Sequence, residues 1–158
     1  MDGNELAESE TEPSISGAEQ GLLTIAVVYL PIVVLGAVLS FVFQVGAEPA
    51  GSPAADLPLR GTALAPPLFL PLALLVGAAL ARRPGGTGFL GKALVLGVGL
   101  AFVAGSTFNL PNDLRAAEAV GSPPTLTFAL GVLHLVLGLT LIFQAAVAVG
   151  SQIKRERA

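Results

Sequence analysis

The sequence predicts an all-α, polytopic membrane protein: a four-transmembrane-helix bundle that follows an acidic, disordered N-terminal tail. The chain of 158 residues is 53% hydrophobic and only 12% charged, whereas soluble proteins average about 25% charged residues. Its charges are nearly absent from four stretches, and each stretch is about as long as the ~20 helical residues that cross a hydrocarbon core. The length suits a single domain.

These stretches define one transmembrane domain over residues 21–150. The predicted spans cover about residues 21–45, 63–81, 89–108 and 126–149. Segments so long and so poor in charge differ from soluble core helices, whose apolar positions recur on one face only. Lys92 lies near one end of the third span, and we expect its long side chain to reach outward to the membrane surface.

The two ends of the chain differ in charge. Residues 1–20 hold six acidic residues and no Lys or Arg. They contain too few large apolar side chains to offset the entropy of ordering, which predicts a disordered acidic tail. A signal peptide is the alternative, but it would begin with a basic region and have a shorter apolar core. Residues 151–158 form a short basic tail.

The basic residues predict the orientation of the spans. With four spans, both termini and the loop after the second span share one side of the membrane. That side carries Arg82, Arg83, Lys92, Lys154, Arg155 and Arg157, and the other carries only Arg60 and Arg115. Because an excess of Lys and Arg marks the cytoplasmic side, we expect a multi-pass cell-membrane protein with both termini in the cytoplasm. The preference for Arg over Lys, with abundant Ala and Gly, indicates a GC-rich prokaryotic genome.

Small residues recur at four-residue spacing and predict where helices pack. In lipid, helices associate where small side chains let their backbones approach. The predicted packing positions are Ala73, Gly77 and Ala81 in the second span, Ala93, Gly97, Ala101 and Gly105 in the third, and Gly131 and Gly138 in the fourth. We expect the second and third spans to form a tight hairpin through their two stripes.

His134 is the only histidine, and helical periodicity places it on the same face as Thr127 and two glycines. It should therefore point into the bundle. One interpretation is a neutral imidazole that hydrogen-bonds to a neighbouring helix, with Ser40 as the favoured partner. The other is a proton-relay or ligand-contact role, because ionisable residues inside a membrane are functional candidates. A metal or haem site would need further ligands that the spans lack.

Helical rise places several polar residues at similar depth in the outer half of the bilayer. If they converge, they form a polar recess that opens to the outside. The candidate ligand or proton-relay residues are His134, Ser40, Gln44, Thr127 and Tyr29, of which Tyr29 lies deeper.

Composition excludes several classes of function. The chain has no cysteine, which excludes disulfides, thiolate nucleophiles and iron–sulfur clusters. It has no basic field for nucleic acid and no catalytic set, so we expect no enzyme, metal or cofactor. The favoured function is a structural or accessory subunit that contacts the lipid bilayer and other membrane subunits or a second copy. The alternative is a small transporter or oligomeric channel with its recess around His134.

Overall fold

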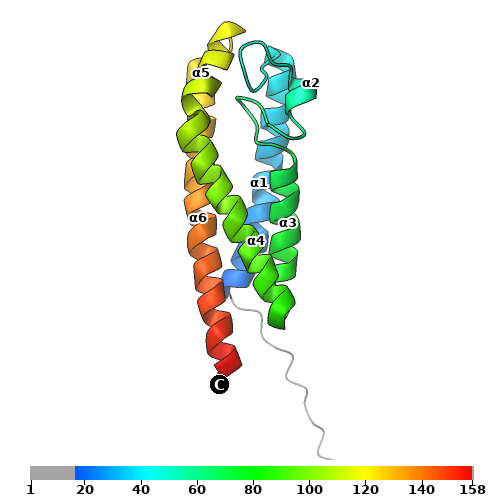
Figure 1. Ribbon diagram of the computed structural model, residues 1–158, viewed down its shortest axis with the longest axis vertical. Coiled ribbons are helices and arrows are strands. Elements are labelled where there is room, and N and C mark those ends of the chain that lie inside the picture. The colour runs from blue at the N-terminus through cyan, green and yellow to red at the C-terminus, as the bar shows by residue number, and fades with distance from the viewer. Residues whose placement is uncertain (1–16, 158) are drawn as a thin grey trace, which may run out of the picture.

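The computed structural model describes residues 17–157, and these form helices and the connections between them, without a strand (Figure 1). The long helices are α1 (Gly17–Phe43), α3 (Phe69–Ala81), α4 (Gly85–Ala104) and α6 (Pro124–Arg157). The short elements are α2 (Pro53–Asp56), the π-helical turn η1 (Gly105–Asn109) and α5 (Leu110–Ala119). The all-α prediction is confirmed for these residues. The predicted disorder of residues 1–16 lies outside the described residues.

The four long helices run side by side and surround one core (Figure 1). Helix α3 contacts α1 and α4, and α6 contacts α4 and α1. The side chains they share include Leu22, Leu74, Val95, Phe102 and Leu141. The beginning of α1 and the end of α6 lie at the same end of the molecule, here called the inner end. The opposite end, which holds α2 and α5, is the outer end.

Three helical stretches are long and apolar enough to cross a membrane: Gly17–Phe43, Gly85–Ala119 and Pro124–Arg157. Large apolar side chains on these helices point away from the core, and Val42 is 67% and Phe143 66% exposed. A soluble protein would bury such side chains, whereas lipid accommodates them. The helix lengths and the surface of the chain are thus those of a membrane protein.

Helix α3 is shorter than the predicted span over residues 63–81, because it begins only at Phe69. Pro66 and Pro67 explain the late start, since proline lacks a backbone N–H and disfavours the α conformation in the residue before it. Residues 62–67 instead form an irregular segment, here called the outer segment. The hydroxyl of Thr62 accepts hydrogen bonds from the backbone nitrogens of Leu64 (3.3 Å) and Ala65 (3.0 Å) within it.

The third predicted span also ends differently, because the helix passes residue 108 through η1 and continues as α5 to Ala119. Gly121 stops it with a φ of 72°, a left-handed conformation that glycine adopts without steric cost. The backbone nitrogens of Gly121 and Ser122 donate to Glu118 (3.1 Å) and Ala117 (2.9 Å). This pair of bonds is the Schellman arrangement that satisfies the last carbonyls of a helix.

Both predicted tails are partly helical. Helix α1 begins at Gly17, so residues 17–20 are ordered and not part of a disordered tail. Helix α6 continues to Arg157 and includes all but the last residue of the predicted basic tail. Side chains from both additions meet at the inner end, as described below.

Helices α3 and α4 pack closely, as predicted, but α4 uses other residues. A Cβ atom on Gly77 would lie 3.1 Å from the Gly91 carbonyl oxygen, and one on Gly91 would lie 2.3 Å from the Ala81 nitrogen. In contrast, Ala93 and Gly97 are exposed, and nothing lies within 4 Å of a Cβ on Gly97. Ala93 and Gly97 therefore do not form the contact with α3 that was predicted for them, because four-residue spacing defines a face but not the direction in which it points.

Helices α4 and α6 cross where two glycines meet. A Cβ atom on Gly138 would lie 2.7 Å from the Gly99 carbonyl oxygen, and one on Gly99 would lie 3.0 Å from the Gly138 oxygen. Gly138 thus lies at a helix contact, as predicted, while its partner Gly99 was not in the predicted set. Gly131 lies against the Leu110 side chain: a Cβ atom on Gly131 would lie 2.9 Å from Leu110 Cδ1.

Candidate functional site

A cavity of about 300 Å³ lies at the outer end, between the α1–α3 connection, the continuous α4–η1–α5 helix and α6. Its polar lining consists of Glu48, Arg60, Thr62, Ser106, Asn109, Asn112, Asp113, Thr127 and His134. This volume is at the lower end of the range for small-molecule sites, about 300–1,000 Å³. Two of the residues predicted to line a polar recess, Thr127 and His134, line this cavity.

The outer segment forms one wall of the cavity, and all six of its residues line it. A Cβ atom on Gly36 would lie 2.4 Å from the Leu64 carbonyl oxygen, so this wall rests directly on α1. Gly36 is seven residues before Phe43, where α1 ends, or about 10 Å along the helix axis.

Ser40 attaches the outer segment to α1. Its hydroxyl donates to the Gly36 carbonyl at 2.8 Å and lies 2.6 Å from the Thr62 hydroxyl. Because Ser40 donates to Gly36, Thr62 is the donor of the second bond. The predicted bond between Ser40 and His134 is therefore wrong, since the outer segment supplies the partner of Ser40.

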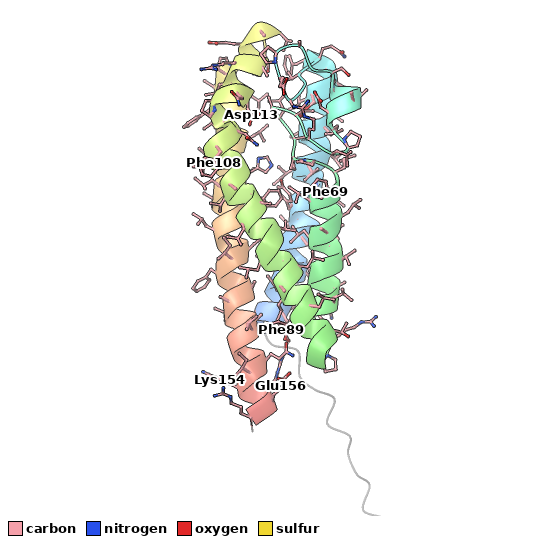
Figure 2. The ribbon with its side chains drawn as sticks, in the orientation of Figure 1. Phe69, Phe89, Phe108, Asp113, Lys154 and Glu156 are labelled. Carbon is pink, nitrogen blue, oxygen red and sulfur yellow. The ribbon has the colours of Figure 1, made fainter. Side chains whose placement is uncertain are left out.

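The opposite wall is built by η1 and α5. Ser106 and Asn109 of the π-helical turn and Asp113 of α5 lie on the same side, where they line the cavity. Figure 2 shows Asp113 on α5, near the outer end of the molecule and beyond the apolar stretch that ends at Phe108. Burial raises the pKa of Asp113 to about 7. Single π-helical turns are frequent at functional sites.

Aromatic rings form the floor of the cavity. Phe102 and His134 line it directly, and their ring centroids lie 5.8 Å apart. Tyr29 of α1 lies behind them, with its ring centroid 5.4 Å from that of Phe102 and 5.7 Å from that of His134, in edge-to-face orientation. This cluster separates the cavity from the apolar core below.

Two buried polar atoms of the cavity wall have no hydrogen-bond partner within residues 17–157: His134 Nε2 and Thr127 Oγ1. Leaving a buried donor or acceptor unsatisfied costs about 1–3 kcal/mol, so such atoms need an explanation. Because both residues line the cavity, a small shift of either side chain would bring its unpartnered atom to water or a ligand there. The Tyr29 hydroxyl also lacks a partner in this part of the chain, but this residue does not line the cavity.

The structure thus brings together only part of the predicted candidate set. His134 and Thr127 line the cavity, Tyr29 lies beneath its floor, and Ser40 lies behind its wall. Gln44 does not line the cavity. It follows the last residue of α1 with a φ of 55°, and its side-chain amide donates to the Phe41 carbonyl. Sequence reasoning missed Asp113, although its spacing of four from Asn109 indicates a shared helix face.

The mouth of the cavity carries a network of charges. Arg60 pairs with Glu48 and lies 3.6 Å from Asp56. Asp56 in turn accepts a hydrogen bond from the Ala47 nitrogen at 2.9 Å. The positive charge of Arg60 is therefore compensated by two carboxylates, both from the α1–α3 connection.

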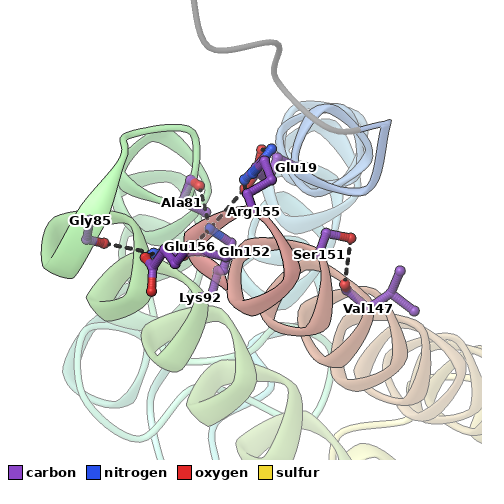
Figure 3. Close-up of polar contacts among 9 residues, drawn as sticks. All are labelled: Glu19, Ala81, Gly85, Lys92, Val147, Ser151, Gln152, Arg155 and Glu156. Atoms are coloured by element: carbon purple, nitrogen blue, oxygen red, sulfur yellow. Dashed lines mark hydrogen bonds and ion pairs between the residues drawn. The ribbon is translucent and has the colours of Figure 1, made fainter. Parts of the chain in front are cut away.

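A second polar cluster lies at the inner end and centres on Lys92, which is fully buried. Its Nζ lies 2.9 Å from Glu19 Oε1 and donates to Gln152 Oε1 (2.7 Å) and the Ala81 carbonyl (3.0 Å) (Figure 3). The ammonium group has three donors, and each has a partner here. The expectation that Lys92 reaches outward is wrong, because these acceptors satisfy it inside the protein.

Two residues of α6 complete the inner cluster. Arg155 donates to Glu19 Oε1 at 2.6 Å, so this carboxylate lies between two cations. Gln152 donates to the Gly85 carbonyl (2.9 Å) and to Glu156 (2.7 Å). The cluster therefore joins α1, α3, α4 and α6 at the inner end.

Comparisons with known protein families, curated proteins and solved structures found no match to this chain. Within residues 17–157, no group of three or more His, Asp or Glu side chains is placed to hold a metal ion. Function must therefore be inferred from the cavity and from the inner cluster.

Proposed function

We propose that the chain is an integral protein of the cell membrane that crosses the bilayer four times, with both termini in the cytoplasm. Helices α1, α4 and α6 make three crossings. The fourth is made by α3, whose 13 residues rise about 20 Å, together with the outer segment. The basic residues Arg82, Arg83 and Lys154 at the inner end support a cytoplasmic location for that end.

We further propose that the protein is a small carrier, with the outer cavity as its binding site for a small polar solute. The unpartnered His134 Nε2 and Thr127 Oγ1 carry this proposal. Both residues line a hollow of small-molecule size, so a small shift of either side chain would let a solute in the cavity supply the missing hydrogen bond and remove the cost of the unsatisfied atom. The inner cluster around Lys92 would then seal the cytoplasmic side while the cavity is open to the outside.

The outer segment supports the same proposal. A continuous helix over residues 62–81 would satisfy the backbone within lipid at lower cost. Instead, the chain contains Pro66 and Pro67, and the irregular backbone lines the cavity. Broken helices of this kind in membrane proteins expose backbone groups where substrates bind.

Cysteine labelling tests whether the cavity is open. The chain has no cysteine, so a Ser106→Cys variant has a single thiol, on the cavity wall. We expect this thiol to react in intact cells with the membrane-impermeant 2-(trimethylammonium)ethyl methanethiosulfonate. Ala93→Cys is the matched control on the exposed face of α4, where lipid should keep the thiol protonated and unreactive. If Thr125→Cys at the outer end reacts but Ser106→Cys does not, the proposal of an open solute site is wrong.

An accessory subunit of a membrane complex is the second candidate. The exposed Ala93 and Gly97 on α4 favour it, because small residues on a lipid-facing surface allow another helix to approach. Replacing Gly97 by Leu should then release the chain from a complex isolated from its native membrane. Unchanged co-purification would count against this function.

A further inference from the structure

We infer that the outer cavity selects a small organic cation, such as a protonated amine, and that Asp113 provides the opposing charge. This inference rests on the proposed function, since it names the class of solute that the same cavity takes. Four titratable or charged residues line the cavity: Glu48, Arg60, Asp113 and His134. Their pairing determines which charge a solute would meet.

The basic side chain of the cavity is already neutralised. Arg60 pairs with Glu48 and also lies 3.6 Å from Asp56. Asp113, in contrast, has no basic group within 4 Å and no hydrogen-bond partner in the part of the chain that the structure describes. An anionic solute would meet an unpaired carboxylate and no free cation on the described lining, whereas a cationic solute would complete an ion pair.

The rest of the lining also favours a hydrogen-bond donor. The imidazole of His134 bonds to the Leu130 backbone, and a backbone carbonyl only accepts, so in the neutral ring Nε2 offers a lone pair. An ammonium group carries donors and no acceptor. Phe102 forms the floor, and aromatic rings attract cations that approach their faces.

The geometry limits the solute to a small molecule. Thr127 and His134 are seven residues apart on α6, or about 10 Å along the helix. Ser106 and Asp113 are also seven residues apart, on the facing wall. A cation bound at Asp113 therefore lies near the mouth, and only a short organic body fits between it and the aromatic floor.

Two reagents of opposite charge test this inference. Ser106 precedes Asp113 on the same continuous helix and lies closer to the aromatic floor, so a reagent that enters from the outer end passes the carboxylate before it reaches the thiol. The probes are the cationic 2-(trimethylammonium)ethyl and the anionic 2-sulfonatoethyl methanethiosulfonates, each applied to the full-length protein in proteoliposomes at pH 8. Rates for Ser106→Cys are divided by those for Thr125→Cys at the outer end, which removes differences in intrinsic reactivity.

We expect the normalised ratio of cation to anion rates to be about tenfold, a size expected of one nearby charge of low solvent exposure. Adding Asp113→Asn should bring this ratio close to one, and a cooperative thermal unfolding transition of the same protein in detergent shows that the variant is folded. A ratio of one or less with Asp113 present, or a preference that survives Asp113→Asn, would overturn the choice of a cation. If neither reagent modifies Ser106→Cys, the open solute site itself is wrong, and this result is distinct from the loss of charge preference.

Discussion

Lys92 Nζ lies 2.9 Å from Glu19 Oε1, and both side chains are withdrawn from solvent. The pair links the first turn of α1 to α4, and Arg155 adds the end of α6 to the same carboxylate. Burying two charges is costly unless each is paired and hydrogen-bonded. Here each charge has several partners, so the inner end depends on the whole cluster.

Replacing Lys92 by Met should therefore destabilise the protein by about 1–3 kcal/mol, because the buried Gln152 and Ala81 acceptors lose their donor while Glu19 keeps its ion pair with Arg155. The measurement is the free energy of unfolding in detergent. Lys154→Met is the matched control, since Lys154 is exposed on the last turns of α6, and we expect it to change stability by less than about 0.5 kcal/mol. A double variant, Lys92→Met with Glu19→Gln, should recover part of the loss. Equal losses for Lys92→Met and Lys154→Met would contradict this role of Lys92.

Gly138→Ala tests the contact between α4 and α6. The new methyl group would lie 2.7 Å from the Gly99 carbonyl oxygen, so the helices must move apart, at a cost of about 1–3 kcal/mol. Gly97→Ala introduces the same methyl group on α4 where no atom lies within 4 Å. We expect it to be neutral or to stabilise the helix by up to about 1 kcal/mol. Thermal unfolding of both variants in detergent decides the question, and a greater loss for Gly97→Ala would refute the packing described here.

The proposed topology has a direct test. A membrane-impermeant maleimide should label Thr125→Cys at the outer end in intact cells. Thr87→Cys, which is exposed at the inner end, should be labelled only after the cells are opened. The expected pattern follows from the excess of basic residues at the inner end. Labelling of Thr87→Cys alone in intact cells would reverse the orientation and place the cavity on the cytoplasmic side.

Asp113 predicts a pH dependence of stability. Burial raises its pKa to about 7 in the folded protein, whereas the unfolded chain has the ordinary value of ~3.9. Between these values the folded state binds more protons, so the contribution of this carboxyl is full below pH ~4 and is lost as pH rises through about 7. The melting temperature of the wild type, relative to Asp113→Asn, should fall across this window and level off near pH 8. A difference that does not vary with pH would show that Asp113 titrates normally.

The long apolar stretches predicted α1, α4 and α6 because hydrophobic length alone specifies a helix in lipid. The beginning of α3 was missed, since apolar composition continues across Pro66 and Pro67 although the helix does not. The prediction for Lys92 failed for a related reason. Hydropathy shows where Lys92 lies along its helix, but it does not show that Glu19 of another helix lies at the same level and pairs with it.

Within the candidate site, helical periodicity correctly placed His134 and Thr127 on one side of α6, where both line the cavity. It failed for the Ser40–His134 bond, because equal depth on two helices says nothing of what lies between them. The outer segment packs there, with Ala63 and Leu64 against α1 and α6 side chains, and Thr62 takes Ser40 as its partner. Only the tertiary fold reveals that contact.

The π-helical turn at Gly105–Asn109 sets the phase of everything that follows it on the same helix. Such a turn holds one residue more than an α-helical path requires, and each residue of an α-helix turns the chain by about 100°. Because the wider turn absorbs that extra residue, Asn112 and Asp113 occupy the directions that an unbroken α-helix would give to the residues before them. Deleting a single residue within the turn would close it to an α-helical one and leave both side chains facing the hollow. The turn is thus a position in the wall where the gene could lose or regain one codon without reorienting the carboxylate.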